Sequence, residues 1–285
     1  MFDKVGVIGA GLMGSEIALV CALAGRDVLL ADTSDDALSR ARDGLARVVD
    51  KGTQRGFYVA GAGEAALGRI TTTTDLAAFA DRDLVTEAVF ENEEVKAGIF
   101  RVLDQVCRPD AVIASNTSTI SITGLASYVG VERRGRFLGT HYFSPVSRMK
   151  LVEVIPGIDT DAATVDDVVA FCRDIGKAPI RVKDVVGFAV NRMLHVFMIE
   201  AIRLVEEGVC TPEEVDIACK LGLGHPVGPF ELSDAVTNRL CLQAQEIMHG
   251  AYGERFRPRP LLKQMVQAGY NGKKAGRGWY RYKTA

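Results

Sequence analysis

His141 and Glu153 are the residues whose types and spacing are best suited to proton transfer. His141 ends an apolar run at 137–141, and Glu153 lies within a second run at 150–156. If the second run is a strand, alternation places Glu153 on an apolar face. A carboxylate there needs a partner, because an unpaired buried charge is costly. A histidine would suit, with the acid fixing the imidazole tautomer. The residues alone leave open whether the two side chains meet.

The polar segment Ser115-Asn116-Thr117-Ser118 directly follows a predicted strand at 111–115. The carboxyl ends of parallel strands line the ligand crevice of an open sheet. We therefore expect at least one of these side chains to have a functional role. The alternative is a helix cap before Ile120, but a cap needs only one of the four residues.

Asn191 opens a predicted helix in the second half of the chain. It is either a helix cap or an amide that reaches a substrate or His141. His195 lies four residues later on the same helical face, among apolar residues, and we interpret it as structural. The sequence has no metal-ligand spacing such as H-E-x-x-H, so we expect no metal.

The first 32 residues place glycines where a dinucleotide would need them. Gly9, Gly11 and Gly14 have G-x-G-x-x-G spacing between a predicted strand and a predicted helix, and a second predicted strand ends at Asp32. In this context the glycines permit a tight turn, close approach of the pyrophosphate and close helix packing. The phosphates would lie at the helix N-terminus, and Asp32 would accept hydrogen bonds from the ribose.

These residues need a sheet to position them, and the pattern predicts one. Strands are expected at 5–8, 28–31, 69–72, 84–89, 111–115, 137–141, 150–156 and 179–182, and helices at 37–49, 93–106 and 162–175. This alternation is typical of a parallel sheet covered on both faces. Later segments are helical, at 192–207, 212–221 and 240–248, with Pro and Gly residues interpreted as the breaks between them. We predict an α/β protein with a Rossmann-type, mostly parallel sheet in residues 1–184 and an all-helical domain in residues 185–285.

Composition excludes several classes of function. The chain has 285 residues and a net charge of −2, which argues against nucleic acid as a partner. No apolar run approaches the length of a membrane span, and the start of the chain does not have the pattern of a targeting peptide. The six cysteines form no C-x-x-C pair, so we expect reduced thiols and a cytoplasmic location.

Seven motifs together resemble the NAD-dependent L-3-hydroxyacyl-CoA dehydrogenase family over almost the full chain. They are VGVIGAGLMG at 5–14, EAVFENEEVK at 87–96, ASNTS at 114–118, HYFSPV at 141–146 continuing through MKLVEVIP, GFAVNR at 187–192, GHPVGPFELSD at 224–234 and GKKAGRGWY at 272–280.

The resemblance implies roles for individual residues. His141 would be the catalytic base paired with Glu153, and Ser118 and Asn191 would contact the oxygens of the substrate. Glu91 and Lys96 would lie near the nicotinamide and Lys51 near the phosphates of CoA. The expected cofactor contacts as a set are Gly9, Gly11, Leu12, Met13, Gly14, Asp32, Glu91, Lys96 and Asn116.

Three segments depart from the family pattern. Residues 142–148 read YFSPVSR where many stand-alone members have FFNPVPV. Gly44 stands where some members have a serine, and residues 234–238 read DAVTN where D-x-x-G-L-D is more usual. These changes leave the expected base and cofactor residues intact and bear on the preference for acyl chains.

The expected function is therefore interconversion of (S)-3-hydroxyacyl-CoA and 3-oxoacyl-CoA by hydride transfer to or from NAD. The alternatives are a dehydrogenase of a non-CoA 3-hydroxy acid and a non-catalytic NAD-binding protein. We also expect a homodimer through the helical half, because Met193, Leu194, Phe197, Met198 and Ile202 give one helix a wide apolar arc.

Overall fold

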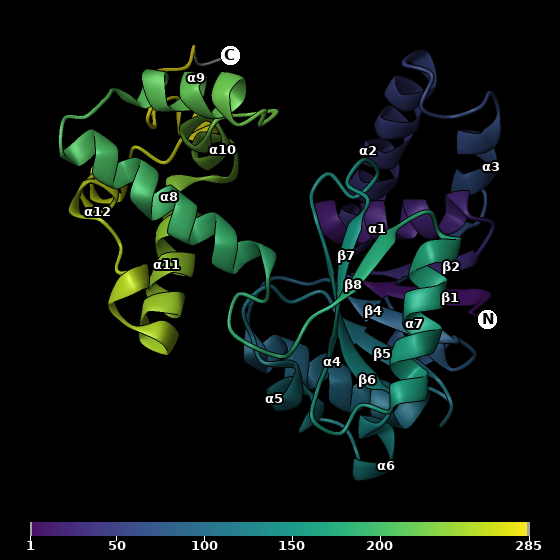
Figure 1. The fold of residues 1–285 in the computed structure, drawn as a ribbon. Coiled ribbons are helices and arrows are strands. Elements are labelled where there is room, and N and C mark those ends of the chain that lie inside the picture. The colour runs from purple at the N-terminus through teal and green to yellow at the C-terminus, as the bar shows by residue number, and fades with distance from the viewer. Residues whose placement is uncertain (1, 284–285) are drawn as a thin grey trace. The chain divides into compact units, whose positions relative to one another are not determined.

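The structure, a computed structural model, describes residues 2–283 and divides into two compact units between Val185 and Val186 (Figure 1). We call them the sheet unit and the helical unit. The sequence places the boundary one residue earlier, between residues 184 and 185. No helix in the part of the chain that the structure describes is long and apolar enough to cross a membrane.

The sheet unit is built on eight strands in the order β3-β2-β1-β4-β5-β6-β7-β8. Their bounds are β1 Lys4–Ile8, β2 Asp27–Ala31, β3 Ile70–Thr73, β4 Leu84–Glu87, β5 Val112–Ser115, β6 Phe137–Tyr142, β7 Leu151–Pro156 and β8 Ala178–Arg181. Strands β1 to β6 run parallel, as short apolar runs joined by helices predict. The expected fold class, a mostly parallel Rossmann-type sheet with a second helical part, is confirmed.

The last two strands reverse the direction of the sheet. β6 pairs antiparallel with β7, and β7 pairs parallel with β8. Only eight residues, 143–150, separate β6 from β7. A connection this short suits an antiparallel hairpin, because a parallel partner needs a longer crossover.

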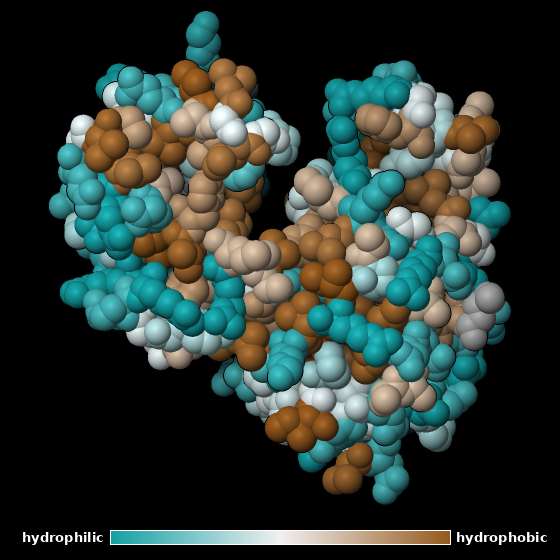
Figure 2. All heavy atoms as spheres, viewed as in Figure 1, coloured by the Kyte–Doolittle hydropathy of each residue, from teal (hydrophilic) through white to brown (hydrophobic). Residues whose placement is uncertain are grey.

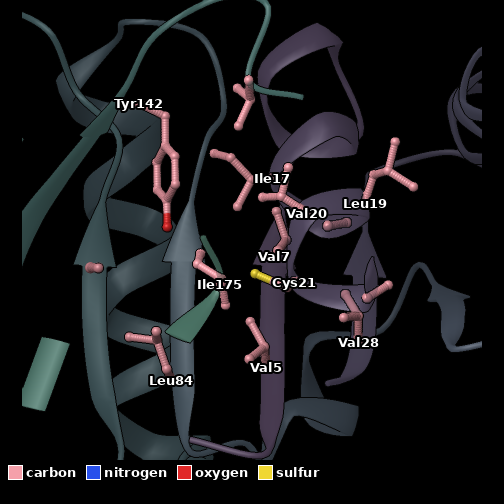
Figure 3. Close-up of a cluster of buried hydrophobic side chains, with 14 of the residues drawn as sticks. Val5, Val7, Ile17, Leu19, Val20, Cys21, Val28, Leu84, Tyr142 and Ile175 are labelled. Atoms are coloured by element: carbon pink, nitrogen blue, oxygen red, sulfur yellow. The ribbon is translucent and has the colours of Figure 1, made fainter. Parts of the chain in front are cut away.

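Helices connect the strands of the sheet unit. They are α1 Leu12–Leu23, α2 Asp35–Gln54, α3 Ala62–Leu67, α4 Glu93–Val106, α5 Ile122–Ala126, α6 Val131–Arg134 and α7 Ala162–Asp174, with a 3₁₀ turn η1 at Leu76–Phe79. The core between α1 and the sheet is apolar: Val5 and Val7 of β1 gather with Ile17 and Cys21 of α1 and with Tyr142 of β6 (Figure 3). This packing holds α1 against β1 and β2.

The helical unit contains α8 Val190–Glu206, α9 Pro212–Gly222, α10 Pro229–Val236, α11 Asn238–Tyr252 and α12 Pro260–Gln267, with 3₁₀ turns η2 Glu254–Phe256 and η3 Lys273–Ala275. α9 begins with a capping box between Thr211 and Glu214. The interpretation of the later prolines as breaks alone is wrong. Pro229 and Pro260 stand at the first positions of α10 and α12, where proline's fixed φ suits a helix start.

Candidate active site

The glycine turn after β1 leaves no room for side chains at two of its positions. Gly9 has φ +100, and a Cβ there would lie 2.7 Å from the Ala88 carbonyl oxygen. A Cβ on Gly14 would lie 1.8 Å from the Gly9 carbonyl oxygen. Each contact is shorter than real Cβ atoms allow, so both positions require glycine.

Gly11 differs, because a Cβ there would meet nothing within 4 Å. It is the N-cap residue of α1, and no side chain caps the helix. The N–H groups of the first turn, including those of Leu12 and Met13, therefore receive no side-chain bond from the N-cap residue, and the space beside the Gly11 Cα is open. An anion at this helix end would be stabilised by those N–H groups and the helix dipole.

Asp32 lies one residue beyond β2, and its carboxylate is held by the backbone. One oxygen accepts from Ala10 N at 2.7 Å and the other from Thr33 N at 2.7 Å. The first bond joins Asp32 to the glycine turn, so the acid and the uncapped helix end belong to one local arrangement. These residues fit the diphosphate and ribose of a dinucleotide.

His141 and Glu153 meet across the β6–β7 hairpin. The two residues are directly opposite each other in the strand register, and His141 Nδ1 lies 2.7 Å from Glu153 Oε2. Glu153 is fully buried and His141 is 5% exposed. When the Nδ1 proton is directed at this carboxylate, Nε2 has a lone pair with which to accept a proton. The pairing left open by the sequence is therefore present.

Ser118 lies on the other side of the imidazole. Its Oγ is 3.0 Å from His141 Nε2, so the nitrogen that faces away from Glu153 faces a hydroxyl. The Phe143 ring packs edge-on against the imidazole, with ring centroids 4.6 Å apart. The imidazole is thus held by contacts on both nitrogens and by an aromatic ring.

The helix-cap alternative for residues 115–118 is wrong for α5, whose N-cap is Ser121, although Thr117 Oγ1 accepts from Ile120 N at 3.0 Å in the turn before it. Ser121 caps α5 through Gly124 N. Asn116 instead joins two strand ends, because its Oδ1 accepts from Tyr142 N at 2.8 Å. Asn116 therefore places the end of β6 next to the end of β5, where Ser118 and His141 meet.

Glu91 and Lys96 form one cluster with the Ser118 segment. Glu91 Oε1 accepts from Ser118 N at 2.8 Å and Thr119 N at 2.9 Å, and Lys96 Nζ lies 3.4 Å from Glu91 Oε2. Burial alone would raise the pKa of Glu91. The Lys96 charge and hydrogen bonds from Thr117, Ser118 and Thr119 outweigh it and hold that pKa below its usual value. Glu91 is therefore an anion near neutral pH.

The other two expected site residues, Lys51 and Asn191, lie on α2 and α8. Lys51 is exposed near the end of α2. Asn191 is the second residue of α8 in the helical unit. It is not the N-cap residue of that helix, which is Ala189.

Glu87, the last residue of β4, is a buried member of this cluster that the motifs do not predict. Its side chain is fully buried and contacts Lys96 Nζ at 2.7 Å. The sequence contains an indication of this role: Glu87 is a charged residue within the apolar strand predicted at 84–89, as Glu153 is within the strand predicted at 150–156. A charge within a buried strand needs a partner, and the partner is Lys96, nine residues later.

Known proteins match the chain over both units. Residues 4–185 match the NAD binding domain of 3-hydroxyacyl-CoA dehydrogenase, and residues 187–282 match its C-terminal domain. A probable 3-hydroxybutyryl-CoA dehydrogenase of Deinococcus radiodurans is 44% identical over 280 residues, 98% of this chain and 100% of that protein. A 3-hydroxybutyryl-CoA dehydrogenase of Bradyrhizobium diazoefficiens is 43% identical over 100% of this chain and 97% of its own length.

A solved structure agrees with these relatives. The (S)-3-hydroxybutyryl-CoA dehydrogenase of Ralstonia eutropha superimposes with a TM-score of 0.94 at 38% identity, covering 100% of both chains. Sequence similarity over both units and agreement of the whole fold point to the same relatives. The chain belongs to the 3-hydroxyacyl-CoA dehydrogenase family.

Proposed function

We propose that this protein interconverts (S)-3-hydroxyacyl-CoA and 3-oxoacyl-CoA with NAD. The observation that carries the proposal is the line Glu153–His141–Ser118, with contacts of 2.7 and 3.0 Å. It provides a base that is oriented on one side and faces a hydroxyl on the other. This is the machinery that removal of a proton from a secondary alcohol requires.

In the oxidative direction His141 Nε2 takes the proton of the substrate's 3-hydroxyl group. Glu153 keeps the imidazole in the required tautomer and stabilises the imidazolium that forms. Ser118 holds the reacting oxygen, and Asn191 is proposed to contact the substrate as well. NAD, when bound, supplies the acceptor for the hydride that leaves C3. In the reverse direction the imidazolium returns its proton to the 3-oxygen.

The proposed cofactor site uses the residues that fit a dinucleotide. The N–H groups of Leu12 and Met13 would hold the diphosphate, and the Asp32 carboxylate would accept from the adenosine ribose. Glu91, Lys96 and Asn116 are proposed to lie on the nicotinamide side.

Three cationic side chains at the end of α2 support the proposal that the substrate carries CoA. Lys51 follows Arg47 by one helical turn on α2, and Arg55, the C-cap residue just after α2, follows Lys51 by four residues; all three are exposed. Residues four apart share one helix face, so these side chains present positive charge together. Such a face attracts the phosphates of CoA.

Oxidation of NADH with 3-oxoacyl thioesters tests the activity. We expect NADH absorbance to fall with acetoacetyl-CoA and with one or more longer 3-oxoacyl-CoAs. Free acetoacetate at the same concentration should give little turnover. Equal turnover with the free acid would favour the dehydrogenase of a non-CoA 3-hydroxy acid. No turnover with either class would favour the non-catalytic alternative.

We further propose a two-fold dimer through the helical unit. Of the apolar residues on α8, Met198 and Ile202 are buried at 4% exposure each, whereas Met193 is 67% exposed. Ile217 and Leu221 on α9 are 52% and 84% exposed, and apolar patches interrupt the polar surface of this unit (Figure 2). Exposed apolar surface of this kind is typical of interfaces. Light scattering at micromolar concentration tests this: twice the 30.7 kDa chain mass supports the dimer, and the single mass refutes it.

The proposal includes a cytoplasmic location. The six cysteines are free, and five of them are buried. Reduced thiols that pack as small apolar side chains suit a reducing compartment.

A further inference from the structure

A fully buried ion pair, Glu87–Lys96, adjoins Glu91, which binds the Ser118 segment. Glu87 ends β4 and Lys96 lies in α4, and both side chains have no exposed surface. Glu87 Oε1 accepts from Lys96 Nζ and from Val89 N, each at 2.7 Å, and Oε2 accepts from Ser115 Oγ at 2.6 Å. Both oxygens of the carboxylate are therefore occupied, and Lys96 is fixed in direction by a partner that cannot reach solvent.

Lys96, held in place by Glu87, also contacts Glu91. Its ammonium lies between the two acids, 2.7 Å from Glu87 and 3.4 Å from Glu91 Oε2. Glu91 is the more exposed of the two acids, because one third of its side chain is accessible to solvent. The contact with Lys96 anchors one oxygen of Glu91 and leaves the other for the segment at 117–119.

Glu91 Oε1 accepts four hydrogen bonds from that segment. It accepts from Thr117 Oγ1 at 2.5 Å, Ser118 N at 2.8 Å, Thr119 N at 2.9 Å and Thr119 Oγ1 at 3.0 Å. These bonds determine where the Ser118 backbone lies and hence where Ser118 Oγ meets His141 Nε2.

We propose that Glu87 is a positioning residue for the reaction, which acts through Lys96 and Glu91 to hold Ser118 at His141. The fully buried Glu87 carboxylate contacts Lys96, Val89 and Ser115 rather than the imidazole. Glu87 affects the rate because its contacts with Lys96, and through Lys96 with Glu91, determine where Ser118 Oγ lies relative to His141 Nε2. The effect on turnover rests on the proposed function, whereas the effect on the order of the Ser118 segment does not.

The Glu87→Gln variant tests the proposal with little change in shape. A neutral amide cannot balance the Lys96 charge, so Lys96 should turn toward Glu91 and disturb its bonds to Ser118 and Thr119. We expect kcat with acetoacetyl-CoA to fall by about tenfold to a hundredfold, as small misplacements of reacting groups do. The KM of the thioester should change by less than about threefold, since the hydrogen bonds of the Glu87 side chain go to Val89, Lys96 and Ser115 and not to the proposed CoA contacts. An unchanged kcat would overturn the proposal.

Asp104→Asn is the matched control. Asp104 lies on the same helix α4, about 12 Å along its axis from Lys96. It pairs with the buried Arg133 at 3.3 Å and accepts from Gly130 N at 3.0 Å. This variant loses a comparable ion pair but has no contact with Glu91. It should lower the melting temperature and keep kcat. Equal losses of kcat in both variants would show that general destabilisation explains the effect and would overturn the proposal.

A double-mutant cycle tests the route through Lys96. In a Lys96→Met background the connection is already cut, so Glu87→Gln should change kcat by less than about twofold. An undiminished effect of Glu87→Gln in that background would show that Glu87 acts by another route, and the proposal would fail. If Glu87→Gln does not fold, Glu87→Asp replaces it, because it keeps the charge and withdraws the carboxylate by one methylene.

Hydrogen exchange of the unliganded protein gives a readout that needs no activity. Peptides that cover residues 116–121 should exchange faster in Glu87→Gln than in wild type and in Asp104→Asn. Unchanged exchange there would contradict the proposal even if turnover falls. Faster exchange in a protein without dehydrogenase activity would refute the proposed function and leave the positioning of Ser118 by Glu87 supported.

Discussion

His141 and Glu153 are direct neighbours across the antiparallel pair of β6 and β7, with His141 Nδ1 2.7 Å from a carboxylate oxygen of Glu153. Parallel strands would not bring these two residues together over so short a connection. The reversal of direction at β7 is therefore the feature of the fold that creates the acid–histidine pair.

Glu153→Gln should lower kcat by about tenfold or more, because a neutral amide cannot stabilise the imidazolium. His141→Ala should lower it by about 10²–10⁴-fold, the range for loss of a general base. Binding of NADH, followed by its fluorescence, should remain close to wild type in both. Glu132→Gln, at an exposed position on α6, controls for the substitution itself. Near-normal turnover of either site variant would mean that the pair is not the catalytic base.

Asp32 should set the preference for NAD over NADP. Its carboxylate lies beside the glycine turn and would repel a 2′-phosphate. Asp32→Asn removes the charge and keeps an oxygen for Ala10 N, so the ratio of kcat/KM for NAD to that for NADP should fall. Asp36→Asn, which removes an exposed charge in the first turn of α2, should leave the ratio unchanged. Equal use of both cofactors by wild type would contradict the prediction.

The cofactor end of the site could be predicted because its pattern is local. Gly9, Gly14 and Asp32 lie within 24 consecutive residues, and their spacing specifies the turn. The acid–histidine pair could be suspected from Glu153 on an apolar face. The register that joins it to His141 depends on the direction of β7, which apolar runs do not encode.

Other features could not be predicted for physical reasons. α10 and α12 have eight residues each, too few for a clear helical periodicity, and both begin at a proline that resembles a break. The bonds of Glu91 to Ser118 and Thr119 cross 27 and 28 residues of sequence. Such contacts follow from the order of β4 and β5 in the sheet rather than from any spacing along the chain.

His195 should make stability depend on pH below neutrality. It is 5% exposed, its Nδ1 has no hydrogen-bond partner among the described residues, and burial lowers its pKa to about 4. A lowered pKa means that the folded state binds this proton less readily than the unfolded state. Its contribution to stability is therefore present above pH 6.5 and is lost as the pH falls toward 4.

Urea unfolding at pH 7.5 and pH 4.5 measures this contribution. The free energy of unfolding of the wild type should fall between pH 7.5 and pH 4.5. We expect this fall to be smaller by about 2 kcal/mol in His195→Leu. His249→Leu is the control, because His249 is 37% exposed and lies 3.3 Å from Glu254. It should change the pH dependence much less. Equal pH dependence in wild type and His195→Leu would show that His195 does not carry the effect.

Thr237 occupies a backbone conformation that favours glycine. It has φ +118 and ψ +137, and it stands where the family's D-x-x-G-L-D pattern has glycine. A residue with a Cβ is strained there by about 1–3 kcal/mol. Its hydroxyl partly compensates, because Thr237 Oγ1 caps α11 by accepting from Leu240 N at 3.3 Å.

The two contributions can be separated by opposite substitutions. Thr237→Gly relieves the strain and loses only a few tenths of a kcal/mol of capping, so it should stabilise the protein by about 1 kcal/mol. Thr237→Ala keeps the strain and loses the cap, so it should destabilise by about 1 kcal/mol. The next residue, Asn238, is fully buried and hydrogen-bonded to Ser233 and Trp279, and both variants leave it in place. Urea unfolding of the two variants gives the order. A glycine variant less stable than the alanine variant would mean that this backbone is not strained.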